Sequence, residues 1–235
     1  MRTLTFENVT VRFGSRRRGT VAVDDVSLVV PAGQVVGLVG ESGSGKSTLA
    51  RAAVGLAPLT AGRITPSARG RHVQMVFQDP YSALDPRMSI GESIAEAMPS
   101  VDRAEVARLL ELVGLPADRA RDRPHLLSGG QRQRVALARA LAGNPEVIIA
   151  DEITSALDVS IQGAVLNVVR ELQRRMNLTM LFISHNLAVV RYVSDIVAVM
   201  REGKIVEYGP VDEVLGDPRH EYTRELLAAV PRPAH

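Results

Sequence analysis

Cysteine is absent from the 235 residues of this sequence. Disulfide bonds and thiolate metal sites are therefore excluded. Long apolar runs are also missing, since none approaches the roughly 18 to 20 residues that a membrane-spanning helix needs. The first residues, MRTLTFENVTVRFG, lack the apolar segment of a secretion signal. Together these absences predict a soluble chain that works in the reducing cytoplasm.

A large excess of charge is lacking as well, because 28 lysines and arginines face 26 aspartates and glutamates. The formal net charge of +2 is too small to indicate a nucleic-acid partner. The one local run, Arg16, Arg17 and Arg18, is typical of a solvated loop tip, with contact to an anionic lipid or phosphate as the alternative. With 46% hydrophobic residues, the chain can bury the core of one compact domain with a smaller inserted lobe.

Three short apolar runs predict the central strands of a parallel sheet. They occupy residues 35–39, 147–150 and 180–183, do not alternate with polar residues, and are each followed by a polar position. Helical patterns lie between them, the clearest over residues 161–176, where apolar residues recur every three or four positions. Strands that alternate with helices predict an α/β fold.

The rest of the chain shows other patterns. Residues 4–11 and 26–30 alternate like half-buried strands, the first with one irregular step. Residues 80–142 contain no convincing strand, and the apolar spacing at 106–113 predicts an amphipathic helix that ends at a glycine. We therefore expect an inserted helical lobe, followed near the end of the chain by a hairpin and a last helix at about 222–230.

The segment GESGSGKS, residues 40–47, fits G-x-x-x-x-G-K-[ST] and lies between an apolar strand and a helix, which is the context that this motif requires. Its glycines allow successive backbone N–H groups to face the phosphates of ATP at the positive end of the helix. Lys46 would hold the β- and γ-phosphates, and Ser47 would offer its hydroxyl to Mg²⁺. The predicted ATP-binding residues of this loop are Gly40, Ser42, Gly43, Ser44, Gly45, Lys46, Ser47 and Thr48.

Two carboxylates follow the apolar run at 147–150. A buried strand end is a costly place for charge unless a partner is present, and a nucleotide-bound cation would be one. Asp151 is suited to hold Mg²⁺, and Glu152 can polarise the attacking water. Taken alone, the pair could equally cap a helix, but beside the phosphate loop it predicts an NTPase.

The segment Leu127-Ser128-Gly129-Gly130-Gln131 precedes a second helical pattern. Ser128 could cap that helix, and the glycines could expose its free N–H groups, which would make a second anion site. Two such sites can bind two ligands or close head-to-tail with a second subunit. The segment resembles the signature of ABC ATPases and lies, as in that family, between the phosphate loop and the acidic pair.

The resemblance extends to other positions and implies their roles. Gln78 is similar to the Q-loop glutamine that touches the Mg²⁺ and water site, and His185 to the switch histidine that contacts the γ-phosphate. Ser155 to Asp158 resemble the D-loop, which crosses the dimer. Phe13 resembles the aromatic that stacks on adenine, where tyrosine is commoner. The resemblance assigns contacts with the ATP of the opposite subunit to Ser128, Gly129, Gly130, Gln131 and Asp158.

Within the family, the chain most resembles the ATPases of dipeptide, oligopeptide and nickel importers. The similar stretches are residues 37–49, 77–91 and 220–231. Glu221 stands where those proteins usually have proline, and Ile153 where proline commonly follows the acidic pair. Neither difference removes a catalytic group.

The resemblance implies a P-loop NTPase (RecA-like) core with an N-terminal antiparallel β-subdomain and an inserted helical subdomain. We expect a single domain over residues 1–235, with core and β-subdomain at about 1–79 and 143–235 and the helical subdomain at about 80–142. The implied function is ATP hydrolysis with Mg²⁺, catalysed by Glu152, His185, Lys46 and Gln78, with Ser47, Gln78 and Asp151 at the metal.

The expected partners are two integral-membrane permease subunits, a second ATPase that is identical or related, and an extracytoplasmic solute-binding protein. The chain would then lie in the cytoplasm, peripheral on the inner face of the cell membrane, and energise uptake of peptides, nickel or a related solute. Two alternatives stay open: an ATPase of a non-transport assembly such as the carbon-phosphorus lyase complex, and a catalytically silent nucleotide-binding module. Mg²⁺-dependent phosphate release would distinguish the silent module.

Overall fold

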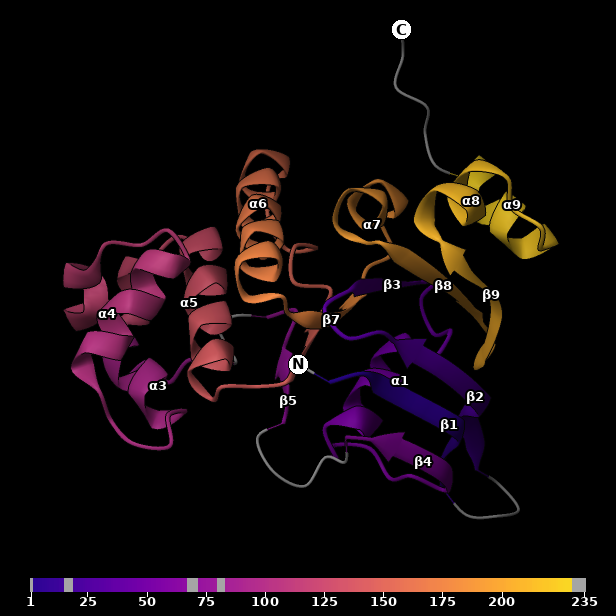
Figure 1. Ribbon diagram of the computed structural model, residues 1–235, viewed down its shortest axis with the longest axis horizontal. Coiled ribbons are helices and arrows are strands. Elements are labelled where there is room, and N and C mark those ends of the chain that lie inside the picture. The colour runs from indigo at the N-terminus through magenta and orange to yellow at the C-terminus, as the bar shows by residue number, and fades with distance from the viewer. Residues whose placement is uncertain (1, 15–18, 67–71, 80–82, 230–235) are drawn as a thin grey trace, which may run out of the picture.

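The computed structural model describes residues 2–14, 19–66, 72–79 and 83–229. It forms an α/β fold with two sheets, in which helices flank a larger mixed sheet and a smaller antiparallel sheet lies beside it (Figure 1). The arginine run at residues 16–18 falls outside the described residues.

The larger sheet has six strands in the order β5-β6-β7-β3-β8-β9, of which all but β9 are parallel to their neighbours. The strands are β5 (Val73–Val76), β6 (Val147–Asp151), β7 (Thr179–Ile183), β3 (Val35–Val39), β8 (Ile196–Arg201) and β9 (Lys204–Pro210). The three predicted apolar runs are confirmed as the adjacent strands β6, β7 and β3, in which every residue is buried. Burial on both faces explains why these runs do not alternate.

The smaller sheet pairs β1 (Leu4–Phe13) with β2 (Thr20–Val30) on one side and β4 (Ala61–Thr65) on the other. The irregular step predicted in the first strand is confirmed, because the register shifts between Phe6 and Val9. Strand β4 was not predicted from the sequence, because its residues are exposed apart from Ile64 and therefore show no apolar alternation.

Between residues 83 and 142 the described chain forms helices and turns only, as predicted. The expected helix at 106–113 is α4, which begins at Arg103 beside the capping side chain of Asp102 and is followed by Gly114. The helices of the whole described chain are α1 (Lys46–Ala53), α3 (Ile90–Glu96), α4 (Arg103–Leu112), α5 (Gly129–Ala142), α6 (Val159–Met176), α7 (Leu187–Val193), α8 (Val211–Gly216) and α9 (Glu221–Ala228), with short 3₁₀ turns at Ala117–Arg121 and Pro124–Leu126.

Two apolar cores hold these layers together. One joins the antiparallel sheet, α1 and one face of the mixed sheet, so that α1 is packed between the two sheets. The other joins the opposite face of the mixed sheet to α5, α6 and α7 and extends into α3 and α4 (Figure 1). Among the described residues, no helix is both long and apolar enough to cross a lipid bilayer. The boundaries of the helical subdomain at residues 80 and 142 stay a prediction.

Candidate functional site

The loop between β3 and α1 has a backbone that only glycine accommodates at two points. Gly40 has a φ of 150°, and a Cβ atom there would lie 2.1 Å from the Met200 carbonyl oxygen. Gly45 has a φ of 107°, and its Cβ would lie 2.3 Å from the Ala22 carbonyl oxygen. The glycine pattern therefore serves both backbone conformation and close packing.

This phosphate loop is tied to both sheets through the β8–β9 turn. The N–H of Gly203 donates to the Ser44 carbonyl at 2.9 Å, and the Gly203 carbonyl accepts from the N–H of Asp24 in β2, also at 2.9 Å. Ser42 and Gly43 at the loop tip stay exposed, while Ser44 is buried and Thr48 in α1 is half-buried. One turn thus connects the loop backbone to β2.

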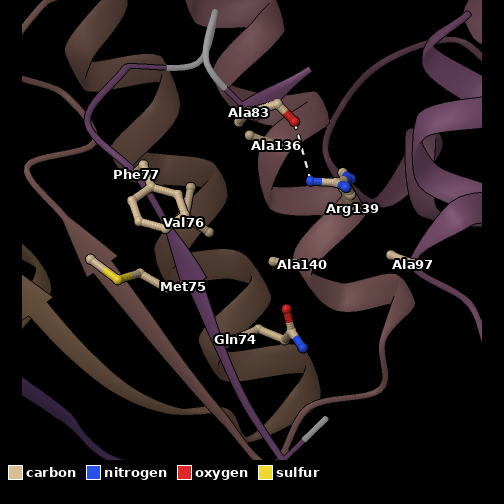
Figure 2. A pocket seen from close by; sticks show the side chains of 9 residues that line it. All are labelled: Gln74, Met75, Val76, Phe77, Ala83, Ala97, Ala136, Arg139 and Ala140. Carbon is tan, nitrogen blue, oxygen red and sulfur yellow. Dashed lines mark hydrogen bonds between the residues drawn. The ribbon is translucent and has the colours of Figure 1, made fainter. Parts of the chain in front are cut away.

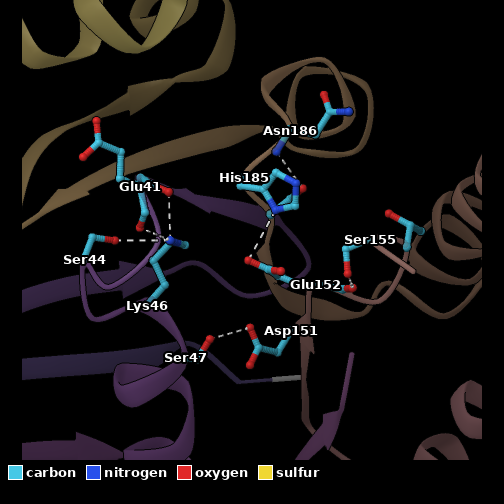
Figure 3. A network of polar contacts seen from close by, with 12 residues as sticks. Glu41, Ser44, Lys46, Ser47, Asp151, Glu152, Ser155, His185 and Asn186 are labelled. Atoms are coloured by element: carbon cyan, nitrogen blue, oxygen red, sulfur yellow. Dashed lines mark hydrogen bonds and ion pairs between the residues drawn. The ribbon is translucent and has the colours of Figure 1, made fainter. Parts of the chain in front are cut away.

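Lys46 is buried at the start of α1, and its ammonium turns back into the loop (Figure 3). Its Nζ donates to the carbonyl oxygens of Gly40 at 2.8 Å and Glu41 at 2.7 Å, and to Ser44 Oγ at 3.2 Å. Burial lowers the pKa of Lys46, while the carboxylates of Glu152 and Asp151 act to raise it. The ammonium group is therefore held inside the loop, close enough to Glu152 and Asp151 for their charges to affect its pKa.

Ser47 and Asp151 meet across α1 and β6. Ser47 Oγ donates to Asp151 Oδ1 at 3.0 Å. Burial raises the pKa of Asp151, although the Ser47 hydrogen bond acts to lower it. A nearby cation would stabilise the ionised form of this buried carboxylate. The hydroxyl and carboxylate oxygens are also ligands that suit Mg²⁺.

Glu152 lies one residue further, in a left-handed conformation with a φ of 49°. Its N–H donates to the Ile183 carbonyl at 3.0 Å, and its own carbonyl accepts from the Ser155 hydroxyl at 2.9 Å. Its side chain faces His185 after β7, with Nδ1 of the histidine 3.5 Å from Oε1 (Figure 3). Neighbouring parallel strands thus bring the glutamate and the histidine to the same edge of the sheet.

Gln78 follows β5 at the same edge of the mixed sheet, and Phe13 lies at the end of β1 in the antiparallel sheet. Gln78 is exposed two residues after β5, which pairs with β6 so that Val76 lies opposite Ala150. Phe13 ends β1, where it pairs with Thr20 of β2, and 46% of the residue is exposed. An aromatic ring left half exposed is available for stacking.

The second predicted anion site has the expected helix cap. Ser128 Oγ accepts from the N–H of Gln131, and the Gln131 side chain accepts from the N–H of Ser128, which is a capping box at the start of α5. Gly130 is buried, and a Cβ there would lie 2.4 Å from Ile161 Cγ2 in α6. The glycine therefore permits packing of α5 against α6.

Residues 128–131 are not joined by any hydrogen bond between described residues to the phosphate loop of the same chain. In Figure 1, α5 stands with α3 and α4, whereas α1 lies against the antiparallel sheet. Asp158 precedes α6 as an exposed residue and makes no side-chain cap. The structure therefore brings Lys46, Ser47, Asp151, Glu152 and His185 together, whereas no hydrogen bond between described residues joins residues 128–131 to them.

Two residues that support the site were not predicted from the sequence. Asn186 accepts hydrogen bonds from the N–H groups of Ala188 and Val189 and so begins α7 directly after His185. An asparagine before an apolar helical run is a helix-cap signal that the sequence does contain. The hydroxyl of Tyr222 accepts a hydrogen bond from the N–H of Glu41 at 3.0 Å. No local sequence pattern predicts this contact.

Comparison with known proteins agrees with this geometry. The family model described as ABC transporter matches residues 23–155. A predicted peptide import ATP-binding protein of Brucella abortus (strain 2308) is 50% identical over 232 residues, which cover 90% of this chain and 70% of that protein. The oligopeptide transport ATP-binding protein OppF of Bacillus subtilis (strain 168) is 47% identical over 239 residues, covering 92% of this chain and 78% of OppF.

Solved structures of similar fold include nucleotide-bound ATPases. A dimeric post-hydrolysis state of the ATP-binding cassette MJ0796 with ADP and Pi superimposes with a TM-score of 0.77 at 26% identity, covering 88% of this chain and 98% of that one. The cbiO1 protein of Clostridium perfringens, part of the ABC transporter complex cbiONQ, gives 0.79 at 26% identity over 97% and 96% of the two chains. The chain therefore belongs to the ABC transporter family, as one of its ATP-binding subunits.

Proposed function

We propose that this chain hydrolyses ATP to energise the import of peptides or a related small solute, with nickel as a second possible cargo. The observation that carries the proposal is the meeting of the phosphate-loop lysine and serine with two carboxylates at one edge of the sheet, where Ser47 Oγ lies 3.0 Å from Asp151 Oδ1. Relatives named for peptide import and oligopeptide transport support the class of cargo.

Ser47 and Asp151 would hold Mg²⁺ together with the phosphates of ATP, with Gln78 joining them from the end of β5. Among the described residues, no group of three or more histidines, cysteines or carboxylates is placed to cage a metal. Mg²⁺ in nucleotide sites keeps several waters and is bound through one or two carboxylates plus substrate phosphates. When bound, the ion would neutralise charge that develops on the phosphate oxygens.

The protein groups divide the chemistry between them. Lys46 holds the β- and γ-phosphates and stabilises the charge on the γ-phosphoryl group during transfer. Glu152 orients the attacking water and accepts its proton, and His185, 3.5 Å from that carboxylate, contacts the γ-phosphate. Phe13, which is left about half exposed, stacks on adenine.

Two subunits complete each site in this proposal. The capped N-terminus of α5 presents Ser128 and the adjacent N–H groups to the γ-phosphate held by the other subunit, and Asp158 crosses the interface beside it. Because no hydrogen bond between described residues joins residues 128–131 to the phosphate loop of the same chain, a head-to-tail dimer would give this segment a ligand. ATP then favours the closed dimer through contacts that hydrolysis removes.

The proposal places a permease helix against a groove between β5 and the helices α3 and α5. The groove is lined by Gln74, Met75, Val76, Phe77, Ala83, Ala97, Ala136, Arg139 and Ala140 (Figure 2). Arg139 connects the segments that line the groove, because its guanidinium donates to the carbonyls of Ser93 and Ala83 and forms an ion pair with Glu96. Gln78 directly follows Phe77, which lines the groove, so a movement of Gln78 at the ATP site would be passed to the groove along the chain.

Affinity purification of the tagged chain from native membranes in mild detergent tests the assembly. Two multi-span permeases, an ATPase partner and an extracytoplasmic binding protein are the expected companions, and they would place the chain on the inner face of the membrane. Soluble metabolic enzymes without any membrane subunit would contradict the importer and favour the carbon-phosphorus lyase alternative. Mg²⁺-dependent release of phosphate by the assembly separates an ATPase from a silent nucleotide-binding module.

A further inference from the structure

The peptide unit between Gly40 and Glu41 is held at both of its polar ends. Its carbonyl, on Gly40, accepts from Lys46 Nζ at 2.8 Å, and its N–H, on Glu41, donates to the Tyr222 hydroxyl at 3.0 Å. Gly40 has a φ of 150°, a backbone region in which side chains other than glycine are rarely found. Because glycine tolerates many other conformations as well, the orientation of this peptide depends on the groups that bind it.

Tyr222 is itself firmly placed at the start of α9. Only 2% of the residue is exposed, and its backbone N–H donates to His220 Nδ1 at 3.1 Å, which caps the helix. The guanidinium of Arg201 lies over the tyrosine ring at 4.7 Å from its centre. The ring is thus fixed by packing, and the hydroxyl is what reaches the phosphate loop.

The segment before α9 is anchored in turn to β9. Glu207 accepts from the N–H of Arg219 at 2.8 Å and from the N–H of His220 at 3.2 Å. Burial acts to raise the pKa of Glu207, but the hydrogen bonds that the carboxylate accepts outweigh it and lower that pKa. A charged acceptor therefore holds the chain entering α9, which strengthens the placement of Tyr222.

We propose that Tyr222 is a positioning residue for ATP binding. Its hydroxyl keeps the Gly40–Glu41 peptide oriented with the carbonyl toward Lys46, and this carbonyl fixes the ammonium where the β- and γ-phosphates arrive. Without the hydroxyl, the peptide is free to turn, and Lys46 loses one of its three acceptors. The proposal rests on the proposed function, because it assigns a role within the same ATP site.

The test is the affinity for MgATP of the full chain carrying Tyr222→Phe, measured by isothermal titration calorimetry. Phenylalanine keeps the ring and its contact with Arg201, so only the hydroxyl is lost. Without the hydroxyl, MgATP must reorient the freed peptide at a cost of about one net hydrogen bond, so we expect binding weaker by about threefold to tenfold. Tyr208→Phe is the matched control, because its hydroxyl donates to the Val29 carbonyl at 2.9 Å, away from the phosphate loop. It should bind MgATP as the unchanged chain does.

Hydrogen–deuterium exchange of the Glu41 amide provides a second readout that packing of α9 alone would not change. We expect faster exchange of this amide in Tyr222→Phe and no change in Tyr208→Phe. Equal MgATP affinity in all three chains overturns the role of Tyr222, as does unaltered exchange at Glu41. If the unchanged chain binds no MgATP, the proposed function fails, and the exchange measurement still reports on the hydrogen bond itself.

Discussion

Replacing Glu152 by glutamine separates catalysis from nucleotide binding at this site. The two side chains have nearly the same size, and either can occupy the backbone conformation with a φ of 49° that is held by the Ile183 and Ser155 hydrogen bonds. The change therefore removes a negative charge and a proton acceptor while leaving the turn in place. We expect the variant to fold as the unchanged chain does.

The size of the effect follows from the position of the carboxylate. A general base contributes about 100-fold to 10,000-fold to a rate, or roughly 3 to 5 kcal/mol of barrier. Of the carboxylates that act to raise the pKa of Lys46, Glu152 has the largest effect. Its loss therefore leaves less negative protein charge near the ammonium group. Phosphates can provide that negative charge, and MgATP should bind to the variant as well as to the unchanged chain or more tightly.

The assay is steady-state phosphate release by the assembled transporter, together with MgATP binding by the isolated chain. Glu41→Gln is the matched control: Glu41 also acts to raise the pKa of Lys46, but its side chain is exposed on the loop. We expect Glu152→Gln to lower turnover by at least about 100-fold, and the control by less than about threefold. Turnover within tenfold of normal in Glu152→Gln would refute its role as the base.

Three further predictions test other parts of the structure. Gly130→Ala places a Cβ 2.4 Å from Ile161 Cγ2 and should lower the free energy of unfolding by roughly 1 to 3 kcal/mol in urea titrations. Gly163→Ala in α6 is the control, because a Cβ there meets nothing within 4 Å, and it should raise the free energy of unfolding. Because burial raises the pKa of Asp151, its ionised form is disfavoured in the folded chain, so stability without nucleotide should fall as the pH rises above the ordinary aspartate value of 3.8. Asp151→Asn should flatten that dependence, and an unchanged pH profile would contradict the assignment. Phe13→Ala should weaken MgATP binding by roughly threefold to tenfold in calorimetry while Phe13→Tyr preserves it, and equal affinity in all three would remove Phe13 from the site.

The chemistry-bearing edge of the sheet was predictable because its signals are local. Buried parallel strands appear as uninterrupted apolar runs, and the residues that follow them, such as Asp151 and His185, must lie at one edge of the sheet once the strands pair. The cap formed by Ser128 was likewise readable, since a hydroxyl residue three positions before a glutamine is a capping signal.

The features that the sequence did not predict depend on contacts between distant parts of the chain. Gly130 packs against Ile161, some thirty residues further along the chain, and no local pattern shows this contact. Tyr222 and Glu41 are 181 residues apart in sequence. Strand β4 has one buried residue and leaves no periodicity to detect. Tertiary packing decides such cases, and it is not encoded in any short window.

The hydrogen bonds of Gly203 to Ser44 and Asp24 bear on how ATP binding is driven. A flexible loop must lose conformational entropy when it wraps a ligand, at about 1 to 2 kcal/mol for each residue that becomes fixed. Here the β8–β9 turn restrains the middle of the phosphate loop before any nucleotide arrives, so much of that entropy is already lost when the chain folds. Nucleotide exchange should then be governed by the opening of the subunit pair, not by reordering of the loop.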